Sequence, residues 1–270
     1  TDQQKVKNLI GSGTVTLYAV WAQKVHSVSV NLTSPQSGDV QIKLQQGDAV
    51  YAVKETAMAE TNGGYAGACA LTDIPSGTYN IVVTQTLSDG NTVTVTKSVV
   101  LTGDQDVTVA IPEKGISSML VIEEGSLPVI VGGLEAEAEN NRQNDKNVTM
   151  TMAVTGKTEQ QLAATASKTS KATQDAVSAI KAVADGKMLE FISIELEKTI
   201  AGSTGVPVAT AVNETETVFE LVFPHELNGK RNIRIYREHD GTVTEFTELN
   251  AKPTEYEDGT FYVDKTNNLI

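Results

Sequence analysis

The 270-residue sequence is poor in cysteine, in aromatic residues and in basic residues. Cys69 is the only cysteine, so the chain has no internal disulfide. Aromatic residues make up 5 %, whereas threonine and valine are abundant, and this bias favours pleated sheets over helices. Apolar residues make up 40 %, which is enough to build ordinary globular cores.

Positive charge is scarce as well. Lysine and arginine number 21 against 34 acidic residues, and the formal net charge is −13. Nucleic-acid binding depends on Lys and Arg that neutralise phosphates, so we expect no nucleic-acid partner. Electrostatic docking on an anionic membrane is disfavoured for the same reason.

Long apolar runs are missing too. No stretch approaches the roughly 20 apolar residues of a membrane-spanning helix, so we expect no membrane insertion. The sequence begins at Thr1 without a charged and then apolar leader, and we expect any targeting segment or wall anchor to lie outside it.

The sequence also lacks the motifs of common active sites. There is no Gly-Lys-Ser/Thr phosphate loop, no Gly-x-Ser-x-Gly elbow and no Gly-x-Gly-x-x-Gly turn. The three histidines, His26, His225 and His239, have no metal-ligand spacing. His239 lies between Glu238 and Asp240, which could form a metal or acid–base site, but the following Asp-Gly turn predicts an exposed hairpin end. We therefore expect no enzyme, and no catalytic, cofactor-binding or metal-binding residues.

Alternating apolar and polar residues predict a β-sandwich over residues 26–112. Five runs have a period of two, and turn residues separate them: Val28–Leu32, Val40–Leu44, Asn80–Thr84, Thr92–Thr96 and Asp106–Ala110. Short strands at this spacing, without intervening helices, are typical of a sandwich.

Residues 113–270 predict a second β-rich domain with one packed helix. The expected strands are Asn147–Val154, Met188–Leu196, Val218–Phe223, Asn232–Tyr236, Val243–Phe246 and Thr260–Val263. Apolar residues at helical spacing predict a helix near 172–185 that buries Ala176, Ile180 and Val183. The acidic segment 132–147 is expected to be a long exposed loop or a linker.

Three groups of motifs resemble known families. Residues 1–25, with Thr14-Val-Thr-Leu-Tyr-Ala-Val-Trp21, resemble the terminal strand of a truncated internalin-type B repeat. Residues 26–112, with Asn62-Gly-Gly-Tyr65 and Ile74-Pro-Ser-Gly-Thr-Tyr79, resemble collagen-adhesin B-type and carboxypeptidase-regulatory-like modules, which implies a transthyretin-like sandwich. Its expected core contains Tyr65, Leu71, Ile74, Tyr79, Ile81 and Val83.

The adhesin resemblance raises the question of internal cross-links. Such modules often have a Lys–Asn isopeptide bond, but the expected last strand contains no Asn. Asp106 could replace it, with Lys43 as the donor and Glu55 as the catalyst, although Lys43 between Ile42 and Leu44 is expected to face outward.

A thioester between Cys69 and Gln85 is a second possible cross-link. A lone Cys more often behaves as a small buried hydrophobe, and we expect Cys69 to be largely buried. Calcium is conceivable at Asp104 and Asp106 or at the acidic 132–147 segment, yet no Asp-x-Asp-x-Asp-Gly loop exists.

Residues 116–270 resemble a C-terminal domain of large, repeat-bearing surface proteins of Gram-positive-type bacteria. The motifs are Pro128-Val-Ile-Val-Gly-Gly133, Phe223-Pro224 and Asn232-Ile-Arg-Ile-Tyr-Arg-Glu-His-Asp-Gly241. The resemblance implies no catalytic activity, and it implies one more strand after Leu269-Ile270. If that strand is missing, we expect a monomer or weak self-association through an open sheet edge.

Together these resemblances favour a non-catalytic extracellular segment of a bacterial cell-surface or cell-wall protein. It would act as a stalk or spacer and in adhesion, with a host protein or glycan as partner. The alternative is an accessory or ligand-binding module of a secreted carbohydrate-active or other hydrolase. Binding through loops 55–64 or 132–147 would call for a compact cluster of exposed aromatic residues, and the sequence does not reveal one.

Overall fold

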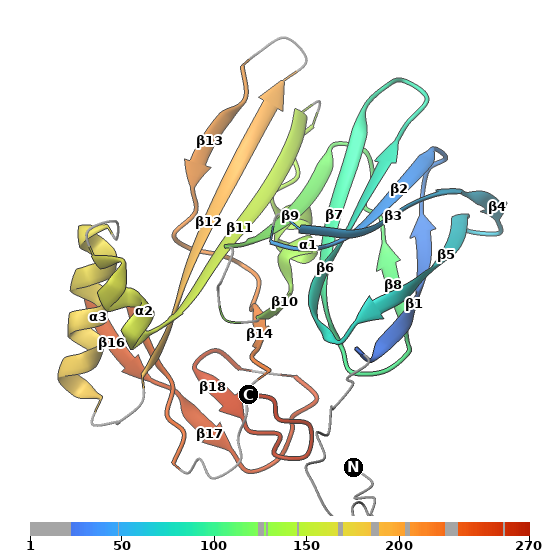
Figure 1. The fold of residues 1–270 in the computed structure, drawn as a ribbon. Coiled ribbons are helices and arrows are strands. Elements are labelled where there is room, and N and C mark those ends of the chain that lie inside the picture. Colours follow the sequence, from blue (N-terminus) through green and yellow to red (C-terminus); the bar gives the residue numbers. More distant parts are fainter. Residues whose placement is uncertain are drawn as a thin grey trace, which may run out of the picture.

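Two β-rich domains lie side by side in the computed structural model (Figure 1). The structure describes residues 23–47, 49–123, 127, 129–144, 146–166, 170–184, 189–202, 206–224, 232–255 and 257–270. The expected B-repeat strand at 14–21 lies outside the described residues, and so does His225. Among the described residues, no helix is both long and apolar enough to cross a bilayer.

The first domain is a β-sandwich of two four-stranded sheets, as the sequence predicts. One sheet has the order β3-β2-β6-β7 and the other the order β4-β5-β1-β8. The strands are β1 (Val25–Ser34), β2 (Asp39–Gln46), β3 (Ala49–Ala57), β4 (Ala59–Thr61), β5 (Gly64–Pro75), β6 (Gly77–Thr86), β7 (Thr92–Leu101) and β8 (Gln105–Ala110). The first and last of them, β1 and β8, pair in parallel, while β1 and β5 pair in antiparallel fashion.

Alternation along each strand fills the space between the two sheets. In β1 the side chains of Val28, Val30 and Leu32 are buried, and the residues between them face outward. The predicted core is confirmed for five of its six members, Leu71, Ile74, Tyr79, Ile81 and Val83. Tyr65 is only half-buried because it lies at the end of β5 beside the β4–β5 turn.

The second domain is built on a four-stranded sheet of order β13-β12-β11-β9. Its strands are β9 (Ile116–Ile122), β11 (Lys146–Thr158), β12 (Glu190–Gly202) and β13 (Val208–Ala211). The long strands β11 and β12 pair over their whole lengths, and β9 pairs with β11 in parallel. Alternate β11 residues, among them Met150, Met152 and Val154, are buried in a second core.

Smaller pairs of strands complete this domain. β10 (Ile130–Gly132) pairs with β14 (Glu220–Val222), β15 (Tyr236–His239) with β16 (Thr242–Glu245), and β17 (Thr247–Leu249) with β18 (Thr260–Tyr262). The β15–β16 hairpin turns at Asp240-Gly241, where both residues have positive φ. This is the hairpin end predicted around His239, and the side chain of His239 is 57 % exposed.

The described part of the chain contains three helices where the sequence predicts one. α1 (Leu134–Asn140) lies inside the segment 132–147, so the prediction of a long exposed loop there is wrong. Leu134 and Ala138, one helical turn apart, are buried against the second core and hold α1 in place. α2 (Glu159–Ala164) continues from β11 and begins with a capping box between Thr158 and Gln161.

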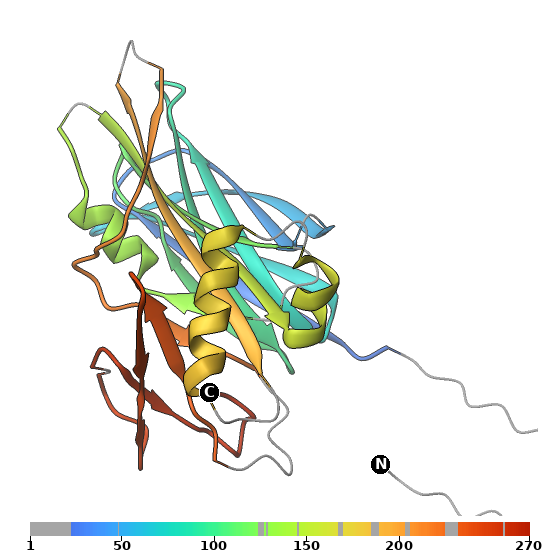
Figure 2. The same ribbon diagram turned by 90° about the vertical axis from the view of Figure 1, so that its left-hand side faces the viewer.

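α3 (Lys171–Val183) is the predicted helix, but its predicted burial is wrong. Ala176 and Ile180 are only half-buried, and Val183 is 53 % exposed. The reason is that α3 packs against β15 and β16 rather than directly on the main sheet. Figure 2 shows α3 standing beside β12. Apolar spacing alone indicated a buried face without indicating how closely a partner approaches it.

The two domains meet edge to edge. β7, at one edge of the sandwich, lies beside β9, the edge of the second sheet (Figure 1). The backbone N–H of Thr94 on β7 donates to Ser117 Oγ on β9 at 3.1 Å. Each domain thereby covers an edge strand that would otherwise be open.

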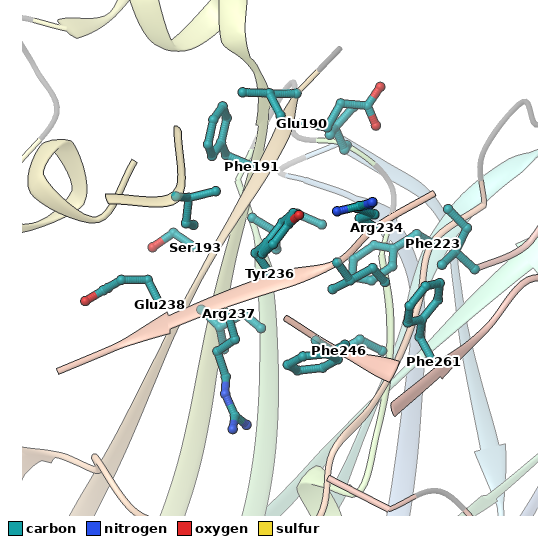
Figure 3. Close-up of a pocket in the computed structure, with 18 of the residues that line it drawn as sticks. Glu190, Phe191, Ser193, Phe223, Arg234, Tyr236, Arg237, Glu238, Phe246 and Phe261 are labelled. Atoms are coloured by element: carbon teal, nitrogen blue, oxygen red, sulfur yellow. The ribbon is translucent and has the colours of Figure 1, made fainter. Parts of the chain in front are cut away.

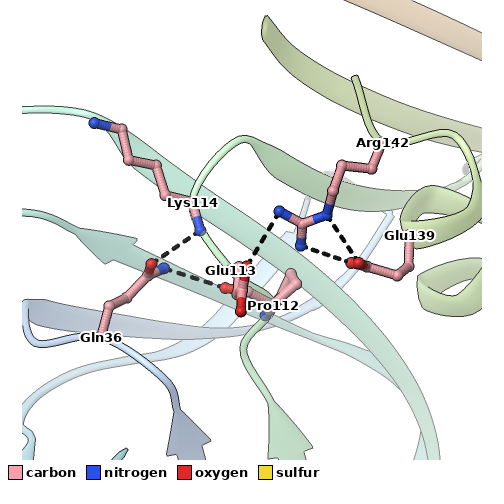
Figure 4. A network of polar contacts seen from close by, with 6 residues as sticks. All are labelled: Gln36, Pro112, Glu113, Lys114, Glu139 and Arg142. Carbon is pink, nitrogen blue, oxygen red and sulfur yellow. Dashed lines mark hydrogen bonds and ion pairs between the residues drawn. The ribbon is translucent and has the colours of Figure 1, made fainter. Parts of the chain in front are cut away.

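The link between the two domains, residues 112–115, is held by Gln36 of the first domain (Figure 4). Its side-chain amide donates to the Pro112 carbonyl at 3.1 Å and accepts from the Lys114 backbone N–H at 2.9 Å. Lys114 also pairs through its ammonium group with Asp89 in the β6–β7 turn. The link is therefore attached to the first domain at both a backbone and a side-chain position.

Arg142 of the second domain holds the same link from the other side (Figure 4). Its guanidinium lies 3.2 Å from Glu113 Oε2 and donates two hydrogen bonds to Glu139, at 2.8 and 3.0 Å. The hydrogen bonds from Arg142 to Glu139, together with the nearby Glu113, raise the pKa of Arg142 above its usual value. Contacts from both domains thus fix the course of the chain between them.

Candidate binding cleft

An open cavity of about 1890 Å³ lies in the second domain between β12, α3 and the C-terminal strands. β12 contributes Phe191–Glu195, and α3 contributes the side facing it, with Val177 and Ile180. The segments 218–224 and 232–239 form further walls. Figure 3 shows Phe223, Phe246 and Phe261 gathered around the space, with Phe191 across it. Concave, mainly apolar hollows of this kind are where proteins usually bind other molecules.

All five phenylalanines of the chain line this cleft. They are Phe191, Phe219, Phe223, Phe246 and Phe261, and Tyr236 and Tyr262 lie among them. Phe191 and Phe261 are buried, and the other three phenylalanines are half-buried. The sequence revealed no aromatic cluster because these residues belong to different strands and loops. Folding brings these rings together around one hollow, where three of the phenylalanines stay partly accessible.

An ion pair and a cation–π contact order one wall of the cleft. The guanidinium of Arg237 donates to both carboxylate oxygens of Asp258, at 2.6 and 3.0 Å. Its central carbon lies 5.3 Å from the ring centre of Phe246. The hydrogen bonds from Arg237 hold the pKa of Asp258 below its usual value. This two-point ion pair fixes the position of β15 against the β17–β18 region. It also neutralises the charge of Arg237 with that of Asp258.

Among the described residues that line the cleft, acidic side chains outnumber basic ones. Four of these residues are basic, Lys157, Arg234, Arg237 and Lys252. Eight carboxylates line it: Glu123, Glu190, Glu195, Glu220, Glu238, Glu257, Asp258 and Asp264. Three of the basic groups pair with carboxylates, since Lys157 lies 3.4 Å from Glu123 and Arg234 lies 3.6 Å from Glu245. A cationic ligand therefore suits this surface better than an anionic one.

The residues considered for a thioester do not come together. Cys69 lies on β5 and packs against the sandwich core, while Gln85 lies on β6 in the opposite sheet. The Gln85 amide is fully buried, accepts from Ser34 Oγ at 2.9 Å and donates to the Gln36 carbonyl at 2.9 Å. Cys69 is half-buried rather than largely buried, and burial raises the pKa of its thiol.

The residues considered for an isopeptide bond are also apart. Lys43 lies between the buried Ile42 and Leu44 of β2 and faces outward from one sheet. Asp106 precedes the buried Val107 of β8 and faces outward from the other sheet. The two side chains point away from each other across the whole sandwich, so they cannot be joined without refolding.

His26 and Asp104 have a structural role at one end of the sandwich. His26 is 4 % exposed, with Nε2 2.8 Å from Ser76 Oγ and Nδ1 4.0 Å from Asp104. Asp104 Oδ1 also accepts from the Ser27 backbone N–H at 2.8 Å. In the part of the chain that the structure describes, no group of three or more His, Cys, Asp or Glu residues could hold a metal ion.

Glu137 is a buried carboxylate that the sequence did not single out. It is 2 % exposed on α1, where Oε2 accepts from the Thr217 backbone N–H at 3.0 Å and Oε1 from Asn141 Nδ2 at 2.9 Å. Asn141 in turn accepts from Lys198 Nζ at 3.0 Å. This network fastens α1 to β12 and to the segment before β14, so Glu137 supports one wall of the cleft.

Comparison with known family models and curated proteins identifies no relative of this chain. No family model matches the chain, and no curated protein matches it either. The three motif resemblances therefore stay predictions, and the function has to be argued from the geometry.

Proposed function

We propose that this chain is a non-catalytic extracellular segment of a bacterial cell-surface protein that acts as a stiff two-domain spacer. The observation that carries the proposal is the link at residues 112–115, which contacts from both domains hold in place. Flexibly joined domains usually meet through small polar contacts and move relative to each other. Here an edge-to-edge contact of two sheets and a hydrogen-bonded link act together, which suits a module that holds a neighbouring surface at a set distance.

Distances between the domains test the stiffness. Spin labels at Glu60 on β4 and Thr210 on β13, in a Cys69→Ser background, should give one narrow distance distribution by double electron–electron resonance. Gln36→Ala combined with Arg142→Ala should broaden it. Lys171→Ala, which removes an exposed ion pair with Asp175 on α3, is the control and should leave it narrow. A broad distribution in the unaltered protein would contradict the spacer role.

The location at the cell surface has a separate test. Antibodies raised against the chain should label intact cells of the source bacterium as strongly as permeabilised cells. Labelling that requires permeabilisation would overturn the extracellular assignment, whatever the stiffness of the two domains.

A second function, ligand binding, is favoured by the cleft. Half-exposed aromatic surface is costly to keep in water unless it meets a partner, and the half-buried Phe219, Phe223 and Phe246 all line one hollow. Such a cleft fits an adhesive surface segment, and it equally fits an accessory module of a secreted hydrolase. Phe246→Ala, which widens the cleft without breaking a strand pair, should lower ligand binding more than Tyr51→Ala on the distant β3. Equal effects of the two changes would argue against the cleft as the binding site.

A further inference from the structure

β12 is longer than its neighbour on one side. It pairs along its full length with β11, but β13 covers only Glu197–Ile200. One more hydrogen bond continues this pairing, from the Val212 backbone N–H to the Leu196 carbonyl at 2.8 Å. The chain then leaves towards β14, which pairs with β10 instead. A neighbouring strand therefore pairs with β12 along residues 196–200, but β13 does not extend along residues 190–195. The strand position beside residues 190–195 of β12 is called the lane.

The direction of the backbone groups follows from that last hydrogen bond. In an antiparallel sheet, alternate residues direct both N–H and C=O towards the same neighbour. Since the Leu196 carbonyl faces the β13 side, the backbone groups of Ile194 and Ile192 face it too. Among the residues that the structure describes, no backbone group bonds to those of Ile192 or Ile194 on this side. They form a short, unpaired strand edge, the kind of edge that recruits another strand.

The unpaired edge opens directly into the cleft. Residues 191–195 line the cavity consecutively, so both faces of β12 and the edge between them are accessible from it. Ile194 is 41 % exposed although it belongs to the face that forms the core of the sheet. Val177 and Ile180 of α3 and Tyr236 of β15 line the same hollow. Apolar walls therefore flank backbone groups that have no backbone partner among the described residues.

Charge restricts what can occupy this lane. Glu195 and Glu220 line the cleft, and neither has an ion-pair partner among the described residues. Two of the basic side chains that line the cleft are already paired: Lys157 with Glu123, and Arg237 with Asp258. An incoming segment with lysine or arginine beside its apolar residues would complement these carboxylates, whereas an acidic segment would be repelled.

We propose that the cleft binds an extended peptide segment that adds to β12 as a strand beside Phe191–Glu195. This inference rests on the ligand-binding role proposed above and names the ligand class. The lane spans about six residues at roughly 3.3 Å each, which sets the length of the bound segment. Main-chain hydrogen bonds to Ile192 and Ile194 provide affinity. Alternate side chains of the peptide enter the aromatic cleft, and flanking Lys or Arg residues meet Glu195 and Glu220.

The first experiment selects binders for the whole chain from a phage-displayed library of random twelve-residue peptides. We expect enriched peptides in which apolar residues alternate with polar ones and Lys or Arg flanks them. One such peptide is then synthesised with a single N-methyl group at each position in turn. Every second N-methylation in the bound stretch should weaken binding by about tenfold or more, since it removes a main-chain donor, and the intervening ones should have little effect.

Two variants of the protein locate the site. Glu195→Lys should weaken binding of the Lys-flanked peptide by about tenfold. Glu197→Lys is the matched control, because Glu197 lies on the same face of β12 but beside β13 and outside the cleft. Ile194→Pro removes one lane-facing N–H and should abolish binding while the melting temperature shows that the fold persists. If this variant does not fold, the N-methyl series still decides.

The outcomes separate this inference from the broader proposal. Peptide binding that Phe246→Ala weakens, but without a period of two in the N-methyl series, keeps ligand binding and overturns strand addition. Recovery of glycan ligands instead of peptides on the same cleft overturns the inference as well. Pairing of two copies of this chain through β12, seen as a dimer that Glu195→Lys leaves intact, also overturns it. A library that gives no binder at all removes both the peptide ligand and its mode of binding.

Discussion

Single buried polar groups decide how the second domain is held together. Glu137 accepts hydrogen bonds from the Thr217 backbone and from Asn141, and it is 2 % exposed. A buried donor that loses its acceptor costs about 1–3 kcal/mol, which exceeds the net gain from a typical hydrogen bond. The position of α1, and with it one wall of the cleft, therefore depends on one side chain.

Glu137→Ala should lower the free energy of unfolding by about 2–3 kcal/mol, because it leaves the Thr217 N–H buried without an acceptor. Chemical denaturation measures the change. Glu135→Ala on the same helix is the control and should stay within about 0.5 kcal/mol. Equal effects of the two substitutions would show that the buried network contributes nothing.

Cys69 should be a slow nucleophile. It packs half-buried against the sandwich core, and burial raises the pKa of its thiol, so little thiolate forms near neutral pH. A thiol reagent at pH 7 should modify the native protein at least about tenfold more slowly than the protein in urea. Equal rates would place the thiol in solvent and contradict its packing against the core.

Elements differ in how tightly they pack, and α3 packs loosely. Its apolar face looks towards the cleft and towards β15 and β16, and none of its residues is fully buried. Ile180→Asp should therefore cost about 1–2 kcal/mol, less than a charge in a closed core would cost. Val183→Asp, at a position that is 53 % exposed, should stay within about 0.5 kcal/mol. Thermal melts of both variants check this, and a larger loss for Val183→Asp would contradict the position of α3.

At the scale of the whole molecule, the link between the domains should respond to acid. The pKa of Asp89 is lowered to about 2, mainly because the Lys114 ammonium donates to its carboxylate. A carboxyl group with a lowered folded-state pKa stabilises the fold above its ordinary value of 3.8, and this contribution is lost as the pH falls towards 2. The melting temperature should therefore fall over this window, and Asp89→Asn should make the fall shallower.

Asp39→Asn serves as the control for the acid experiment. Asp39 is exposed on β2 and has no ion pair with any described residue, so its substitution should leave the acid-dependent fall unchanged. A fall that is equally steep in Asp89→Asn and in the unaltered protein would show that the contact between Asp89 and Lys114 does not stabilise the link.

The intact chain should also be free of internal cross-links. Lys43 and Asp106 face outward from opposite sheets, and the Gln85 amide is held by Ser34 and Gln36. The measured mass should therefore equal that of the sequence, without the loss of one water or one ammonia. A deficit of either size would mean that a bond has formed between groups that lie apart in this fold.

Alternation along single strands was enough to predict much of this protein from its sequence. Whether Val28 or Ile42 faces inward depends only on the period of two, and the Asp240-Gly241 turn depends on two neighbouring residues. Such features are local, so the strands of the sandwich, the two long strands of the second domain and the exposed position of His239 could be derived before folding is considered. The half-buried state of Tyr65 and Cys69 could not, because it depends on the neighbouring strands.

The cleft and the link between the domains were decided by the tertiary structure alone. Phe191 and Phe261 lie far apart in the sequence, and they share one hollow only because the chain leaves β13 after Val212 and returns through the C-terminal strands. The burial of Glu137 likewise requires Thr217 to arrive from another segment. Contacts of this kind depend on strand order and on where each strand stops pairing, and no local pattern of side chains encodes either of them.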